Sequence, residues 1–188
     1  MDASMEQLTE TRLTSRDIFK GKILHVQYDT VRLPNGAEAA RELIRHVGAV
    51  CVVPLTAGGE VLIERQFRYP MGEVITEIPA GKLDSPEEDP LAAARRELRE
   101  ETGASAGTWT CLGRFYPAAA YSDERIWMYL AEDLTFGAQE LDEDEFLQVR
   151  AVPLEALVEQ ILAGQVPDAK TQTAVLRVWA MRQKTHGK

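Results

Sequence analysis

The sequence predicts an α/β fold in which a mixed sheet lies between helices and a small antiparallel sheet precedes it. Short apolar segments of strand length are interspersed with three segments of helical length, without the strict alternation of a purely parallel sheet. The chain has 188 residues, of which 45% are hydrophobic and 27% charged, as in one sizeable globular domain with a small appendage. We therefore expect an N-terminal sheet region over residues 1–46 and a main domain over residues 47–188.

The first expected element is a β-hairpin over residues 17–46. Its outgoing strand, GKILHVQYDTVRL, places Leu24, Val26 and Tyr28 on one face, and PNG at 34–36 is a turn signal. In the main domain, turn residues bound further segments of alternating or continuous apolar character. These predict strands over residues 48–55, 60–69, 73–81, 109–116, 126–131 and 146–152, and two closing helices over residues 154–164 and 169–183.

Between the third and fourth of these strands, the sequence predicts a helix over residues 90–102. Asp89 is a good N-cap residue, and Pro90 takes the first helical position, where its missing N–H does no harm. Gly103 ends the helix, because glycine readily adopts the left-handed conformation at this position. The helix therefore has clear start and stop signals.

This helix carries three glutamates on one face, and they distinguish it from an ordinary surface helix. Glu97 and Glu101 have no basic residue three or four positions away, whereas Glu100 can reach Arg96. A repulsive pair one turn apart costs only roughly 0.2–0.5 kcal/mol, so a solvated acidic face is one explanation. However, the glutamates border the apolar packing stripe, and the strand and glycine turn EIPAGKLD precede the helix. Clustered oxygen ligands of this kind suit Mg²⁺.

Charge and composition exclude several classes of protein. The formal net charge is −9, which argues against nucleic acid as a partner, because affinity for its backbone comes from clustered Lys and Arg. The N-terminus lacks the pattern of a secretory signal, and the apolar run AVCVVPL is too short to span a membrane. We expect Cys51 and Cys111 to be buried, reduced thiols of a cytoplasmic protein.

The region from residue 81 to residue 104 resembles the Nudix box, the loop–helix–loop signature of the Nudix hydrolases. The resemblance is carried by Gly81, by an acidic residue at 87 or 88, and by RELREETGA at 96–104. Glu87 has the family's spacing from Gly81 and Glu88 has its spacing to Arg96, so the loop is one residue longer and either could fill the first acidic position. The resemblance implies an α/β/α sandwich and hydrolysis of a nucleoside diphosphate linked to another group.

The resemblance also implies roles for residues of the box. Glu97 and Glu101 are expected to bind Mg²⁺, with Mn²⁺ as an alternative, together with the carbonyl oxygen of Ala80. Glu100 is expected to be a catalytic carboxylate that supports them or binds a second ion, and Arg96 to be structural. Divalent ions would neutralise the pyrophosphate, orient the attacking water and stabilise the leaving phosphate.

Outside the box, the chain resembles the branch that contains the ADP-ribose pyrophosphatases. The segments RHVGAVCVVPL, LIERQFRY, EIPAGKLD, YSDE and DEDEFLQV carry this likeness. It implies substrate contacts from Arg68, Glu124 and, across a homodimer interface, Arg41. It also implies that a glutamate of the acidic loop, Glu143 or Glu145, is the general base. The branch commonly forms homodimers in which the N-terminal sheet completes the partner's site.

The leading prediction is therefore a pyrophosphatase that cleaves ADP-ribose to AMP and ribose 5-phosphate. A GDP- or UDP-sugar is the alternative substrate, because alanines in YPAAAYSDE replace the proline–glycine pattern common in ADP-ribose enzymes. A nucleotide-sensing module without catalysis is a second alternative, but such modules typically lose a glutamate of the box. An acidic structural domain is a third, and it leaves the strand–glycine–helix arrangement unexplained.

Overall fold

A computed structural model describes residues 8–141, 143 and 145–186 of the chain, with side chains described as far as residue 184. The chain forms two compact units. Unit 1 comprises residues 1–46 and 118–125, and unit 2 comprises residues 47–117 and 126–188. The segment 118–125 was not assigned to the N-terminal region by the sequence alone. It joins that unit because Ile44 pairs with Ser122 in a parallel bridge.

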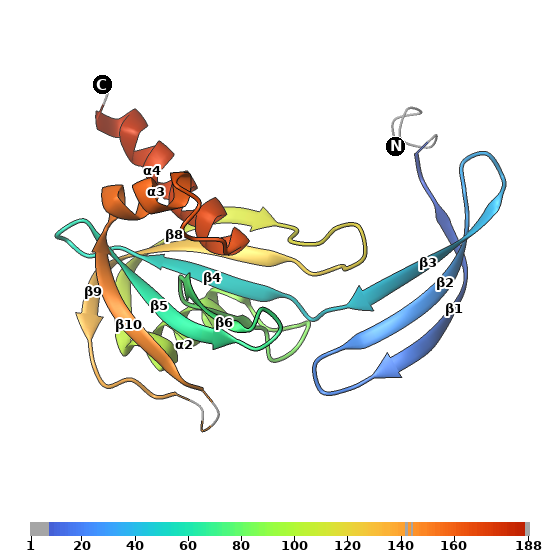
Figure 1. The fold of residues 1–188 in the computed structure, drawn as a ribbon, viewed down its shortest axis with the longest axis horizontal. Coiled ribbons are helices and arrows are strands. Elements are labelled where there is room, and N and C mark those ends of the chain that lie inside the picture. Colours follow the sequence, from blue (N-terminus) through green and yellow to red (C-terminus); the bar gives the residue numbers. More distant parts are fainter. Residues whose placement is uncertain (1–7, 142, 144, 187–188) are drawn as a thin grey trace. The chain divides into compact units, whose positions relative to one another are not determined.

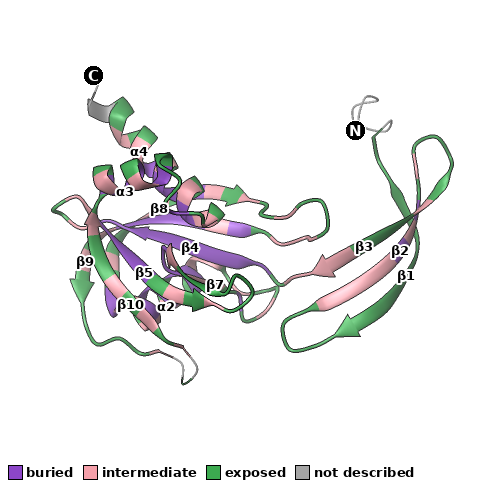
Figure 2. Ribbon diagram, viewed as in Figure 1, coloured by how far each residue is buried: buried purple, intermediate pink, exposed green. Residues whose placement is uncertain are grey.

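Unit 1 contains a three-stranded antiparallel sheet in the order β1-β2-β3 (Figure 1). The expected hairpin is present as β2 (His25–Arg32) and β3 (Glu38–Arg45), joined by a turn in which Gly36 has a φ of 87°. An additional strand, β1 (Thr11–Lys20), precedes it and pairs with β2. All residues of β1 are exposed, so this strand has no burial pattern of the kind that would have predicted it (Figure 2).

Unit 2 contains two sheets, in the orders β10-β5-β6 and β7-β4-β9-β8. The parallel pairing of β4 with β9 among antiparallel neighbours makes the second sheet mixed, as predicted. The strands are β4 (Ala49–Pro54), β5 (Glu60–Arg68), β6 (Glu73–Glu77), β7 (Ala80–Lys82), β8 (Ala104–Phe115), β9 (Ile126–Phe136) and β10 (Leu147–Pro153).

Helices cover both faces of these strands. Alternate residues of β4 belong to different cores: Val50 and Val52 pack with α2 (Pro90–Thr102), whereas Cys51 and Val53 pack with the C-terminal helices. Those helices are α3 (Leu154–Leu162) and α4 (Ala169–His186). Burial on both faces explains why β4 is a continuous apolar run (Figure 2). The predicted α/β sandwich is confirmed. No helix in the described part of the chain is long and apolar enough to cross a membrane.

Two expectations differ from the structure. The segment 73–81 forms two strands, because β6 pairs with β5 whereas β7 pairs with β4. The break lies at Ile78 and Pro79, and proline has no N–H to donate to a ladder. Cys51 is a buried free thiol as expected, but Cys111 is exposed, so the prediction for this cysteine was wrong. It lies beside a register shift in β8 at Gly113, where alternation no longer predicts the buried face.

Candidate active site

Helix α2 has the caps that its sequence predicts. The Asp89 side chain accepts hydrogen bonds from the N–H groups of Leu91 and Ala92, and Pro90 occupies the first turn. At the other end, Gly103 has a φ of 69° and donates its N–H to the Arg99 carbonyl. These caps fix the register of the helix, and with it the direction in which its glutamates point.

Glu97 and Glu101 are buried against the turn that precedes the helix. Their exposed fractions are 9% and 5%, and Glu101 accepts a hydrogen bond of 2.9 Å from the Ala80 N–H. A Cβ atom added to Gly81 would lie 2.0 Å from Glu97 Oε1. A side chain at position 81 would therefore force this carboxylate out of its present position.

Arg96 contacts several of the acidic residues in and before the helix. Its Nη1 lies 2.8 Å from Glu97 and 3.2 Å from Glu100, and its Nε lies 3.6 Å from Glu88. The contact with Glu97 was missed because the helical-spacing argument considers neighbours three or four residues away. Glu88, and not Glu87, contacts Arg96, and Glu88 also accepts the Asp84 N–H.

Burial disfavours the charged forms of both helix glutamates. It raises the pKa of Glu97 to about 7, although the charge of Arg96 and its hydrogen bond oppose the shift. Burial also raises the pKa of Glu101, and the charges of Glu64 and Glu97 raise it further. The hydrogen bond from Ala80 only partly offsets these effects. Without a cation, the cluster therefore tends to retain protons.

Glu64, on β5, is a buried carboxylate that the sequence analysis did not select. It is 3% exposed, and its Oε1 has no hydrogen-bond partner among the described residues. Burial raises its pKa, and the charge of Glu77 adds to the shift. In the sequence, Glu64 directly follows the apolar run VLI and lies two residues after Leu62, so it falls on the same buried face of the strand. This position could have indicated a buried carboxylate.

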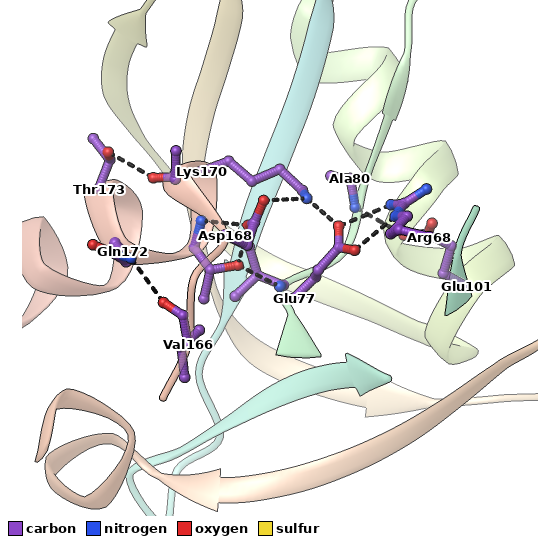
Figure 3. A network of polar contacts seen from close by, with 12 residues as sticks. Arg68, Glu77, Ala80, Glu101, Val166, Asp168, Lys170, Gln172 and Thr173 are labelled. Carbon is purple, nitrogen blue, oxygen red and sulfur yellow. Dashed lines mark hydrogen bonds and ion pairs between the residues drawn. The ribbon is translucent and has the colours of Figure 1, made fainter. Parts of the chain in front are cut away.

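A polar network holds Arg68 at the end of β5 (Figure 3). The Arg68 guanidinium donates two hydrogen bonds to the Glu77 carboxylate, at 2.6 and 2.8 Å. Lys170 also donates to Glu77 and lies 3.0 Å from Asp168. Burial opposes ionisation of Glu77, but the hydrogen bonds and charges of Arg68 and Lys170 hold its pKa below the usual value. Arg68 is therefore orientated by an ionised carboxylate.

The network is anchored to the start of α4, an attachment that was not predicted from the sequence. Asp168 accepts hydrogen bonds from the N–H and the hydroxyl of Thr171, at 2.9 and 2.6 Å. The Thr171 hydroxyl in turn accepts the Ile78 N–H at 2.9 Å. Asp168, Lys170 and Thr171 are neighbours in the sequence, but Glu77 reaches them only through tertiary packing, so no local spacing could have predicted the complete group.

Glu145, in the acidic loop, interacts electrostatically with several buried glutamates. The charge of Glu145 raises the pKa of Glu64, Glu97 and Glu101. Glu145 also borders a cavity of about 560 Å³, lined by Arg65, Phe67, Val74, Leu141, Phe146, Leu147 and Gln148. Glu143 is exposed, and the adjacent Asp142 and Asp144 lie outside the described residues.

The remaining predicted site residues, Arg41 and Glu124, belong to unit 1. Arg41 forms an ion pair with Glu10, and Glu124 lies 3.8 Å from the His46 ring. The neighbouring Asp123 accepts the His46 N–H at 2.8 Å, which fixes this loop to the end of β3.

The chemistry of the donors fits a hard divalent cation. Glu97, Glu101 and Glu64 offer carboxylate oxygens, and the Glu64 Oε1 is buried without a partner in the described part of the chain. No group of three or more His, Cys, Asp or Glu side chains among the described residues is already arranged to hold a metal ion. This agrees with the hydrogen bonds above, because Glu97 is turned to Arg96 and Glu101 to Ala80.

Comparisons with known proteins agree with this geometry. The family model described as NUDIX domain matches residues 45–174, and the model described as nucleoside diphosphate sugar hydrolase N-terminal domain matches residues 10–44. An ADP-ribose pyrophosphatase of Bacillus subtilis is 41% identical over 91% of this chain and 93% of that protein. An ADP-ribose pyrophosphatase of Mycobacterium tuberculosis is 33% identical over 90% and 83%, and a methanol dehydrogenase activator of Bacillus methanolicus is 38% identical over 88% and 90%.

The fold has the same support from a solved structure. A crystal structure of an ADP compounds hydrolase superposes on this chain with a TM-score of 0.84 and 24% sequence identity. The superposition includes 95% of this chain and 97% of the other. The likeness in fold therefore covers nearly the whole chain. The chain belongs to the Nudix hydrolase family, and its similarity is to the ADP-ribose pyrophosphatases of that family.

Proposed function

We propose that the protein hydrolyses the pyrophosphate bond of ADP-ribose to AMP and ribose 5-phosphate, in a reaction that depends on Mg²⁺ or Mn²⁺. The observation that carries this proposal is the pair of buried glutamates, Glu97 and Glu101, packed against Ala80 and Gly81 of β7, where an added Cβ would overlap the Glu97 carboxylate. Two similar proteins named ADP-ribose pyrophosphatase support the choice of substrate.

In this proposal, Glu97, Glu101 and the Ala80 carbonyl hold the divalent cation. The cation supplies the positive charge that the pyrophosphate oxygens and the attacking water require. Glu100 supports the cluster through Arg96, which it contacts at 3.2 Å. Arg96 is a structural residue here, because it also reaches Glu88 and the Lys82 carbonyl and so ties the helix to its preceding loop.

Glu145 is the general base of the proposed reaction, in preference to Glu143. A general base must lie within reach of the attacking water, and its charge must respond to the metal site. The charge of Glu145 acts on Glu64, Glu97 and Glu101, whereas Glu143 is exposed. Glu145 accepts a proton of the attacking water, the water oxygen bonds to one phosphorus, and the bond from that phosphorus to the bridging oxygen breaks. The bridging oxygen leaves with the other phosphate, which gives AMP and ribose 5-phosphate.

Arg68 is the proposed phosphate ligand. Its planar guanidinium suits phosphate oxygens, and its position is fixed by two hydrogen bonds to Glu77. Glu77 also forms an ion pair with Lys170. The Glu77 carboxylate is therefore shared between two cations and does not neutralise the charge of Arg68 completely. The Arg68 side chain is 40% exposed, so it is accessible to a substrate.

We further propose a homodimer in which the N-terminal sheet, and Arg41 with it, contributes to the partner's site. The support is the match of residues 10–44 to an N-terminal domain of nucleoside diphosphate sugar hydrolases. The sheet also leaves several large apolar side chains exposed, among them Leu13, Ile18, Phe19 and Leu24. Glu124 is the proposed additional substrate contact. The two free cysteines accord with a cytoplasmic location.

The substrate is tested with a panel of nucleotide sugars. ADP-ribose, a GDP-sugar and a UDP-sugar are each incubated with the enzyme and Mg²⁺, and the nucleoside monophosphate product is identified. The proposal expects AMP from ADP-ribose with the highest kcat/KM. A higher kcat/KM for the GDP- or UDP-sugar would assign the alternative substrate. A lack of turnover with every substrate, together with tight binding of one, would assign a sensing module.

A further inference from the structure

Glu64 is an unusual residue for the middle of a buried strand. Strand β5 places Leu62 in the core under α2 and Ile63 in the core under the C-terminal helices. Glu64 is in phase with Leu62, so its side chain leaves the strand on the α2 side. Only 3% of the residue is exposed. The chain therefore keeps a carboxylate where packing favours an apolar side chain.

None of the salt bridges among the described residues involves this carboxylate. In the β5–β6 ladder Glu64 stands opposite Glu77, a pairing of like charges that destabilises a sheet. Arg68 and Lys170 act on Glu64 electrostatically, but the hydrogen bonds of both go to Glu77. Glu64 Oε1 consequently has no hydrogen-bond partner in the described part of the chain. A buried polar group in this state is costly unless something outside the chain satisfies it.

The surroundings of Glu64 indicate what that partner is. Among the charged groups around Glu101, Glu64 contributes most to the electrostatic repulsion. The charge of Glu145 also acts on both of them, so Glu64 and Glu101 each experience the negative charge of other carboxylates. The nearest arginine of α2, Arg96, is already held by Glu97, Glu100 and Glu88. Arg68 and Lys170 act on Glu64 from a distance, but their hydrogen bonds go to Glu77, so neither satisfies the Glu64 oxygen.

We propose that Glu64 is a further carboxylate of the divalent-metal site, supplying its Oε1 to a cation that Glu97 and Glu101 also bind. The inference rests on the proposed metal-dependent hydrolysis and adds a residue from β5, outside the helix that carries the other acidic ligands. A divalent cation would satisfy the unpartnered oxygen and remove the repulsion between Glu64 and Glu101 in one step.

The competing explanation is that Glu64 is a neutral, protonated side chain with a purely structural role. Glutamine reproduces the size and neutrality of a protonated glutamate but cannot supply an anionic oxygen. Glu64→Gln therefore separates the two explanations, since only the metal-site role makes it harmful to cation binding. Glu64→Asp keeps the charge on a shorter side chain. Glu60→Gln, at the other end of the same strand, is the matched control.

The experiment is calorimetric titration of the metal-free protein with Mn²⁺ alone, without substrate. We expect Glu64→Gln to weaken Mn²⁺ binding roughly 10- to 100-fold, as is typical when a group that supports a metal site is lost. Glu64→Asp should give an intermediate affinity, and Glu60→Gln should match the wild type. The melting temperature of metal-free Glu64→Gln should equal or exceed that of the wild type, because the substitution relieves repulsion.

Each other outcome overturns the inference in a distinct way. If the wild type binds Mn²⁺ and Glu64→Gln binds it equally well, Glu64 has no part in the metal site while the proposed hydrolysis stands. If metal-free Glu64→Gln melts below the wild type, the carboxylate serves the fold itself. If the wild type binds no Mn²⁺, the metal-dependent function fails and this inference fails with it.

Discussion

At the scale of single residues, the site is defined by carboxylates whose burial opposes their charge. Glu97 and Glu101 could be selected from the sequence because their helical positions are readable from caps and periodicity. Glu64 and Glu77 could not, because a single glutamate in a strand gives no indication of what packs above it. Their meeting with Lys170 depends on β6 and α4 coming together, with the Ile78 N–H bonded to Thr171 of the helix.

The first prediction concerns Glu101. Glu101→Gln should lower kcat/KM by roughly 100- to 1000-fold, because it removes a charge that the transition state requires. The metal-free melting temperature should stay equal or rise, since a buried, repelled carboxylate is replaced by a neutral group. Steady-state kinetics and thermal unfolding test both parts, with the exposed Glu155→Gln as a control. A variant that keeps more than about a tenth of the wild-type kcat/KM would contradict the assignment.

The second prediction separates the two loop glutamates. Glu145→Gln should lower kcat by roughly 100-fold or more, as expected for the loss of a general base, with a small change in KM. Glu143→Gln should stay within a few-fold of the wild type, because Glu143 is exposed. Parallel kinetics of the two variants at saturating Mg²⁺ give the answer. If the effects are reversed, Glu143 is the base and the loop closes differently around the substrate.

At the scale of elements, the glycine turn before α2 determines how closely strand and helix approach. The sequence predicted one strand over residues 73–81, whereas the structure divides it into β6 and β7. The division lets Ala80 and Gly81 pair with β4 and face the helix carboxylates. Pro79 was visible in the sequence, but the change of strand partner was not, because partner choice is a long-range property.

The third prediction tests this turn. Gly81→Ala places a Cβ about 2 Å from the Glu97 carboxylate, so either the helix or the carboxylate must move. We expect loss of most activity, because the Glu97 carboxylate is displaced, with only a small loss of stability, because the group that must move is the end of one side chain. Gly58→Ala is the matched control, because its nearest neighbour is 3.6 Å away and its φ is not positive. Equal activity and stability of the two variants would show that the turn tolerates a side chain.

At the scale of the whole molecule, the charge distribution links stability to pH and to metal. Glu97 has a pKa of about 7 in the folded state against an ordinary value of 4.5, and the pKa values of Glu64 and Glu101 are raised as well. Between pH 4.5 and 7 the folded chain therefore binds more protons than the unfolded chain, and linkage requires that its stability falls as the pH rises. Glu77, with a lowered pKa, acts in the opposite direction only at more acidic pH.

The fourth prediction follows from this sign. The metal-free protein should melt at a temperature several degrees lower at about pH 8 than at about pH 5.5, and saturating Mg²⁺ should recover much of the loss at the higher pH. Glu101→Gln should show a smaller decrease, since one of the responsible groups is gone. Thermal unfolding in buffers of equal ionic strength measures these differences. A melting temperature that rises over this pH range would mean that the three glutamates are not repelled in the folded protein.

The last prediction concerns assembly. The three strands of unit 1 form a sheet with one fully exposed strand and exposed apolar side chains, and such a small sheet needs a cover to be stable. A symmetric dimer supplies one, because the same surface serves both subunits. We expect twice the chain mass in sedimentation at micromolar concentration. We also expect a mixture of Arg41→Ala and Glu101→Gln chains to regain activity, since one site of each hybrid dimer then holds Arg41 from one subunit and Glu101 from the other. Mixing either variant with itself is the control and should restore nothing. A monomer in sedimentation, or no recovery when subunit exchange is demonstrated with labelled chains, would show that each chain builds its site alone.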